Sequence, residues 1–129
     1  MIGNSRALCV FAYTQAVDMR KSFNTLGALV SEEMKREVLT GDMFLFVSAD
    51  RKRAKVLYFD GTGLCLFCKR LEKGKFSPLW NRKRAGGLEM TPSELSLFIE
   101  GSESVGRLPM SPALLTRADL RSKMHRAAT

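Results

Sequence analysis

The sequence contains few of the residues from which metal sites and catalytic triads are built. Its 129 residues include one histidine, His125, and three cysteines. An odd number of cysteines argues against a disulfide framework, and one histidine in a basic segment supports neither a metal site nor a catalytic triad. We therefore expect no metal, no cofactor and no histidine-dependent chemistry.

Long apolar runs are also missing. Met43 to Val47 has the length of a strand, and no run approaches the roughly 18 residues that span a bilayer. The apolar stretch from Ala7 to Tyr13 has neither the basic flank nor the small-residue cleavage site of a secretion signal. These observations predict a cytoplasmic protein that does not enter a membrane.

Two of the cysteines, Cys65 and Cys68, have the C-x-x-C spacing of some zinc and redox sites. They lie in Leu64 to Cys68, which is typical of a strand. Residues three apart in a strand point to opposite faces, so the two thiols cannot share a metal or close a disulfide. We expect both to be buried, reduced and metal-free.

The composition is that of a globular domain, with 45% hydrophobic residues. The length fits one domain, which we assign to residues 1–101. Residues 102–129 are rich in Ser, Ala and Arg and contain Pro109 and Pro112. We predict a C-terminal tail there, for which a weak helix from Pro112 to His125 and a frayed segment remain alternatives.

The first half predicts a strand followed by a long helix. Ala7 to Tyr13 is rich in β-forming residues, and Asp18 has the character of a helix N-cap. Apolar residues then recur at spacings of three and four: Met19, Phe23, Leu26, Val30 and Met34. This stripe predicts an amphipathic helix that runs to about Val38 and ends at Thr40 to Asp42.

Three short apolar runs follow and predict an antiparallel meander. The runs are Met43 to Ala49, Lys55 to Phe59 and Leu64 to Leu71. A basic loop, residues 50–54, separates the first two, and a turn with two glycines, residues 60–63, separates the last two. Phe76 would begin a short fourth strand, and Leu88 to Met90 a last edge strand. We assign Phe44, Phe46, Phe59 and Phe67 to the core.

A short second helix is predicted after the strands. Thr91 fits an N-cap, Pro92 the first helical position and Glu94 a capping box, and Gly101 stops the helix. The expected fold class is α+β: an antiparallel meander sheet of about four to five strands with one long and one short helix packed on it.

Positive charge is concentrated in the middle of the chain. The net charge is +8, and residues 50–84 hold eleven basic and three acidic residues, whereas the rest holds ten of each. A localised basic excess is typical of a protein that binds a polyanion such as nucleic acid. The alternative is a solvated surface that keeps the protein soluble.

The candidate DNA-binding residues fall into four groups. Two basic residues open the predicted helix, where they would form a phosphate site with the helix N-terminus. Two clusters flank the first loop and the later turn of the meander, which lie at the same end of the sheet. A tryptophan beside basic residues could stack on unpaired bases. The set is Arg20, Lys21, Arg51, Lys52, Arg53, Lys55, Lys69, Arg70, Lys73, Lys75, Trp80, Arg82, Lys83 and Arg84.

Several of these residues have an ordinary structural interpretation. Lys69 and Arg70 point to opposite faces of a strand, so one can be exposed while the other extends along the rim of the sheet. Tyr58 is better explained by packing than by base stacking. The remaining cations can equally well keep the protein soluble and protect strand edges from aggregation.

Catalytic carboxylates are not evident. Metal-dependent nucleases need carboxylates that converge on Mg²⁺. The candidates Asp18, Asp42, Asp50 and Asp60 all stand at turns or caps, where aspartate has structural roles. We therefore predict that the protein is not an enzyme.

Three segments in order carry a resemblance to a known family. They are Asp18 to Val30, Lys55 to Leu66 and Lys69 to Phe76. Together they resemble the TnpB accessory proteins, or second-open-reading-frame proteins, of the bacterial insertion-sequence group numbered sixty-six. The resemblance covers about residues 7–101. One departure is that Pro78 precedes Trp80, whereas the family usually has Trp-Pro.

The resemblance implies an accessory role in transposition beside a separate transposase. It supplies no catalytic residues. The first hypothesis is that the protein binds DNA, such as the insertion-sequence ends, through its basic patch without catalysis. The alternative is an adaptor that docks onto the transposase, with the patch against an acidic protein surface.

Overall fold

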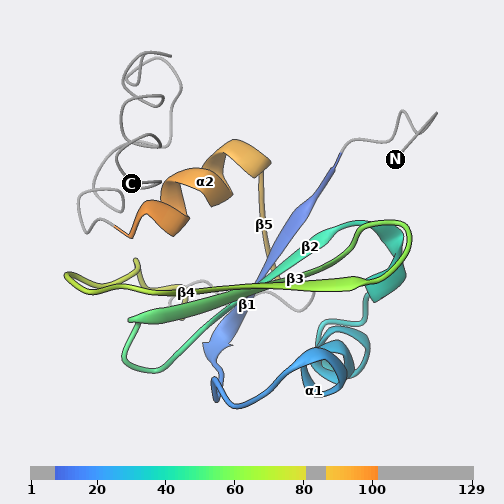
Figure 1. Cartoon of the computed structure of the whole chain (residues 1–129), viewed down its shortest axis with the longest axis horizontal. Coiled ribbons are helices and arrows are strands. Elements are labelled where there is room, and N and C mark those ends of the chain that lie inside the picture. Colours follow the sequence, from blue (N-terminus) through green and yellow to red (C-terminus); the bar gives the residue numbers. More distant parts are fainter. Residues whose placement is uncertain (1–7, 81–86, 102–129) are drawn as a thin grey trace.

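A five-stranded sheet forms the centre of the molecule in a computed structural model, which describes residues 8–80 and 87–101 (Figure 1). The strands are β1 Val10–Ala16, β2 Met43–Val47, β3 Arg53–Phe59, β4 Leu64–Arg70 and β5 Leu88–Met90. Their spatial order is β4-β3-β2-β1-β5. Two apolar layers follow, one on each face, because the central strands bury side chains on both sides.

The predicted meander is confirmed, but the sheet as a whole is not antiparallel. β2 pairs antiparallel with β3, and β3 with β4. β1 instead runs parallel to β2, with Val10 opposite Met43, and β5 pairs antiparallel with the outer side of β1. The sheet is mixed because the 26 residues between β1 and β2 cross one face and return the chain to the same end, as a parallel neighbour requires.

The long helix predicted from Asp18 to Val38 is wrong in its length and in its cap. The helix α1 spans only Phe23–Ala28, continues as one π-helical segment, η1 Leu29–Glu33, and stops before Lys35, whose φ is +56°. A separate 3₁₀ turn, η2 Val38–Thr40, leads into β2. Asp18 does not cap the helix because its carboxylate accepts a hydrogen bond from the Arg20 backbone N–H (2.9 Å) and closes a turn of its own. Ser22 is the N-cap.

The helical segment covers one face of the sheet, as the apolar stripe predicts. Leu26, Val30 and Met34 are fully buried, and they pack with aromatic residues of β1 and β2. Met19 is half-buried beside them. Phe23 departs from the prediction, since 42% of it is exposed: it follows the N-cap, at the end of the helix.

The second helix, α2 Pro92–Glu100, covers the other face and agrees with its sequence signals (Figure 1). The Thr91 hydroxyl accepts a hydrogen bond from the Glu94 N–H (3.1 Å), and the Glu94 carboxylate accepts one from the Thr91 N–H (2.8 Å). Gly101 ends the helix with φ +74°. Phe98 stacks on the buried Phe76, with ring centroids 5.3 Å apart.

The segment at Phe76 is not the predicted fourth strand. Its N–H donates to the Arg51 carbonyl (2.7 Å) across a loop instead of joining the sheet. Phe44 and Phe46 are fully buried as expected, Phe59 is half-buried, and Phe67 is 45% exposed, so its assignment to the core is wrong. The expected tail, residues 102–129, lies outside the described residues. None of the described helices has the length and apolarity needed to cross a bilayer.

Candidate nucleic-acid interface

Two basic loops meet at one end of the sheet, as their order in the meander predicts. β3 begins where β4 ends, with Arg53 opposite Arg70. Beyond the strands, the Leu71 N–H donates to the Lys52 carbonyl and the Phe76 N–H to the Arg51 carbonyl, both at 2.7 Å. We call the cations of these loops the basic end; they are Arg51, Lys52, Arg53, Arg70, Lys73 and Lys75.

The first loop is shaped by its own hydrogen bonds. The Ser48 hydroxyl donates to the Asp50 carboxylate (2.6 Å) and accepts from the Arg53 N–H (3.1 Å). The same carboxylate accepts from the Lys52 N–H (3.0 Å). These hydrogen bonds lower the pKa of Asp50, and the bond from Ser48 has the largest effect. The resulting turn holds Arg51 at φ +59°, a left-handed conformation that a non-glycine residue adopts only when its surroundings require it.

Several candidate cations are already engaged within the fold. The Arg51 guanidinium donates to the Phe76 carbonyl (3.2 Å), and the Lys69 amine to the Ile99 carbonyl (2.8 Å) at the end of α2. Arg70 forms an exposed ion pair with Glu72 (3.1 Å). The expected difference between Lys69 and Arg70 is confirmed, because Lys69 is half-buried along α2 whereas Arg70 is exposed.

Four cations of the basic end have no such partner. Within residues 8–80 and 87–101, their side chains form no hydrogen bond or ion pair. Three are exposed and one is half-buried. We call them the four free cations: Lys52, Arg53, Lys73 and Lys75. They come from both loops, so the backbone bonds between the loops hold positive charge from two parts of the chain together.

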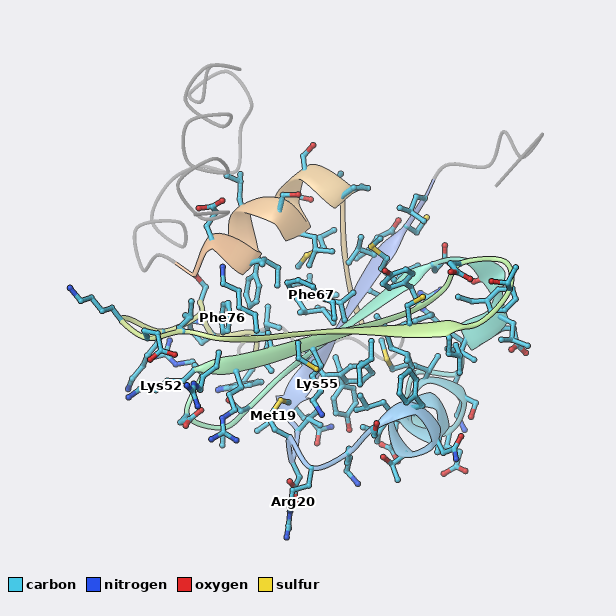
Figure 2. All side chains as sticks on the ribbon, viewed as in Figure 1. Met19, Arg20, Lys52, Lys55, Phe67 and Phe76 are labelled. Atoms are coloured by element: carbon cyan, nitrogen blue, oxygen red, sulfur yellow. The ribbon has the colours of Figure 1, made fainter. Side chains whose placement is uncertain are left out.

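Lys55 belongs to the fold rather than to an exposed patch. Its amine donates to the backbone carbonyls of Met19 (2.8 Å) and Lys21 (2.7 Å). Figure 2 shows Lys55 and Met19 on the α1 side of the sheet. The contact attaches the turn that precedes α1 to the middle of β3.

We expect Lys55→Met to lower the free energy of unfolding by about 1–3 kcal/mol, because two carbonyls lose a charged donor. Lys52→Met is the matched control, since that amine forms no hydrogen bond or ion pair with the described residues, and it should change stability by less than about 0.5 kcal/mol. Urea denaturation measures both. Equal stability of the two variants would contradict the assigned role of Lys55.

Arg20 and Lys21 do not open the helix as predicted. They precede the N-cap Ser22, in the turn that Asp18 closes. The Arg20 guanidinium pairs with the Asp18 carboxylate (2.7 Å) and is largely exposed, and Figure 2 shows it directed away from the sheet. The side-chain hydrogen bond from Arg20 lowers the pKa of Asp18 well below its usual range. The two cations therefore lie just before the helix and not in its first turn.

The aromatic candidates are half-buried. Trp80 and Tyr58 pack against the core on the α2 side, which agrees with the packing interpretation of Tyr58. Arg82, Lys83 and Arg84, the cations that follow Trp80, lie outside the described residues.

The aspartates occupy turns, as the sequence predicts. The Asp60 carboxylate accepts hydrogen bonds from the Thr62 and Gly63 N–H groups, both at 2.9 Å, and closes the turn between β3 and β4. These bonds lower the pKa of Asp60 to about 2. Asp42 is buried before β2. The described ranges contain no group of three or more His, Cys, Asp or Glu side chains that could hold a metal ion.

Cys65 and Cys68 lie on opposite faces of β4, as their spacing predicts. Cys65 is opposite Tyr58, and Cys68 is opposite Lys55. The expectation that both are buried is wrong, because Cys65 is half-buried and Cys68 is exposed. Both lie on β4, which is an edge strand of the sheet. Desolvation, together with a hydrogen bond to Asp60 (3.5 Å), raises the pKa of the Cys65 thiol.

We expect iodoacetamide to label Cys68 several-fold faster than Cys65 in dilute solution near pH 8. The thiolate is the reactive form, and Cys65 is both less accessible and harder to deprotonate. Peptide mass spectrometry over time gives both rates. In Asp60→Asn, the rate at Cys65 should rise towards that at Cys68. Faster labelling of Cys65 in the native chain would contradict the assigned environment.

The family of the chain follows from comparison with known sequences. The family of IS66 Orf2-like proteins matches residues 8–106. The chain belongs to this family. It is 40% identical over 101 residues to the Sinorhizobium fredii protein y4jC, covering 78% of this chain and 85% of the relative. It is 34% identical to y4hO of the same organism, with 78% and 86% covered. No solved structure matches the chain.

Family membership confirms the resemblance on which the sequence analysis relied, and it indicates an accessory role in IS66 transposition. The match spans all five strands and both faces of the sheet, so the basic end lies within the part that defines the family.

For this IS66 Orf2-like chain, sequence reasoning missed the structural roles of Lys55 and Arg51. Nothing in the spacing of Lys55 separates it from the neighbouring basic residues, since its partners are backbone carbonyls 34 and 36 residues away. The role of Arg51 could have been inferred from one feature of the sequence. Ser48 and Asp50 precede it, and these residue types are typical of a tight turn that side chains stabilise.

Proposed function

We propose that this protein assists IS66 transposition by binding DNA without catalysis, through phosphate contacts at the basic end of the sheet. The single observation that carries the proposal is the convergence of the four free cations, from two loops, at one end of β3 and β4. Cations whose side chains form no hydrogen bond or ion pair within the described residues are available to neutralise phosphates, and each contact releases condensed counterions.

The shape of the basic end supports phosphate contacts rather than base reading. Both described helices pack on the faces of the sheet, and neither projects beyond it as a recognition helix would (Figure 1). Lysine and arginine on loops reach the backbone of a duplex without entering a groove. Such contacts position a protein on DNA but carry little sequence information.

The loops are also held in place before any ligand arrives. Backbone hydrogen bonds join them, and the Arg51 guanidinium adds a third link through the Phe76 carbonyl. Less conformational entropy is then lost when the cations meet a phosphate backbone. Arg51 thus acts by positioning its neighbours.

The test is a binding titration of the full chain against insertion-sequence end DNA and random DNA of equal length, with and without the transposase. We expect similar affinity for both DNAs and a steep decrease with salt. Transposase-dependent recruitment without any affinity for DNA alone would contradict the proposal, and it would favour the adaptor role, with the basic end against an acidic protein surface.

A further inference from the structure

The outer edge of β4 is a long strand edge without a partner among the described residues. β4 stands at the end of the sheet order and contributes seven residues, Leu64–Arg70. Soluble proteins usually shorten, charge or cover such an edge, because its N–H and C=O groups can pair with another strand. Here the charge is confined to Lys69 and Arg70, and the exposed Phe67 occupies the middle of the strand.

The hydrogen-bond pattern shows which residues of β4 face outward. The bonds Asp60 N–H to Gly63 carbonyl and Leu71 N–H to Lys52 carbonyl fix the bonded pairs at the two ends of the β3–β4 ladder. Bonded and non-bonded pairs alternate in an antiparallel ladder. Cys65, Phe67 and Lys69 therefore bond to β3. The residues whose backbone groups point to the free edge are Leu64, Leu66, Cys68 and Arg70.

We infer that this edge binds β4 of a second copy of the chain, antiparallel and with Phe67 on the twofold axis. In that register Leu64 is opposite Arg70 of the other copy and Leu66 is opposite its Cys68. All four outward-facing residues then form bonded pairs. Phe67 becomes the central non-bonded pair, in which side chains of two strands approach most closely. The two sheets become one sheet of ten strands with closed twofold symmetry.

Charge along the edge favours this occupant and this direction. The end of β4 towards Arg70 carries the basic loop, whereas the turn before Leu64 carries the exposed Asp60, a carboxylate that is ionised at neutral pH. Antiparallel copies bring the basic end of each towards the Asp60 turn of the other. Parallel copies would align the two basic ends and repel each other.

The aromatic pair explains why Phe67 is exposed on the strand. Figure 2 shows Phe67 on the α2 side of the sheet, yet 45% of its surface is accessible. A cross-strand pair of aromatic rings stabilises two paired strands more than an alanine pair does. The proposal concerns self-association only, so it holds or fails independently of DNA binding.

Site-specific cross-linking tests the register. In a full chain with Cys9, Cys65 and Cys68 replaced by Ala, Phe67→Cys should form a reducible dimer on mild oxidation. Its two Cα atoms would lie about 4.5 Å apart, which a disulfide can bridge. The matched control is Arg70→Cys in the same background, because those positions would lie about 20 Å apart. Equal or preferential cross-linking of Arg70→Cys would overturn the register.

Sedimentation velocity tests the interface itself. The native chain should sediment with the mass of a dimer, twice 14.4 kDa. Phe67→Glu places two carboxylates opposite each other at the twofold axis, so this variant should sediment as the monomer. Phe23→Glu is the control, since Phe23 is 42% exposed on α1, and it should remain dimeric. A monomeric native chain, or a dimeric Phe67→Glu, would overturn the proposal. Circular dichroism is the control that tests whether each variant is folded.

Discussion

Removing the four free cations is expected to weaken DNA binding by about 10²–10³-fold at 0.15 M salt. The variant carries Ala in place of Lys52, Arg53, Lys73 and Lys75. If three or four of these side chains contact phosphates, the slope of log affinity against log salt should become shallower by about three. The loss should be nearly the same for insertion-sequence ends and random DNA, since phosphate contacts do not read sequence.

The variant deliberately keeps Arg51, whose guanidinium and backbone join the two loops. Its net charge falls from +8 to +4, so a second variant must share that charge. Exposed neutral residues on β1, α1 and α2 allow this: Gln15→Glu, Asn24→Glu, Ser93→Glu and Ser96→Glu. We expect this control to keep most of the salt slope. If both variants lose affinity equally, net charge rather than the basic end carries binding.

Strand periodicity predicted the arrangement at the basic end well. The turn with two glycines and the basic loop set three short strands in an antiparallel order, and this order alone brings the two basic clusters together. Alternation along β4 also predicted the different environments of Lys69 and Arg70 and the separation of the two thiols. These features depend on residues close in sequence, where the period of two leaves little freedom.

Contacts between distant segments were not predictable in the same way. The stripe from Met19 to Met34 fits a long helix, yet the helical segment spans only residues 23–33, because Asp18 closes a separate turn before it and Lys35 adopts a left-handed conformation after it. The parallel β1–β2 pair follows from the crossover between those strands, whose strand-helix-strand order is visible in the sequence. The exposure of Phe67 depends on β4 standing at the edge, which the sequence alone does not specify.

Sorting the cations into structural and free ones needed the three-dimensional contacts. Lys52 and Lys55 are three residues apart, but only Lys55 reaches backbone carbonyls across the sheet. A charge count treats the two alike. The candidate site therefore contains fewer basic residues than the sequence suggests. The basic residues that no longer belong to it are bound within the fold, where they hold the free cations in position.

Phe76→Ala is expected to lower the free energy of unfolding by about 3–5 kcal/mol. Phe76 is fully buried on the α2 side and stacks on Phe98 at 5.3 Å. Truncation leaves a cavity under α2, and it removes the anchor from a segment whose backbone bonds to Arg51 in both directions. For a domain of this size the loss is a large share of the total stability, which is typically about 5–15 kcal/mol.

Urea denaturation with a spectroscopic readout measures the change, with Phe23→Ala as the control. The ring of Phe23 is 42% exposed and lies outside the core, so its removal should cost less than about 1 kcal/mol. Because Phe76 holds the second basic loop against the first, the folded fraction of Phe76→Ala should also bind DNA more weakly than the native chain under conditions where both are folded. A Phe76→Ala variant as stable as Phe23→Ala would contradict the packing of α2 on the sheet and the link from that core to the basic end.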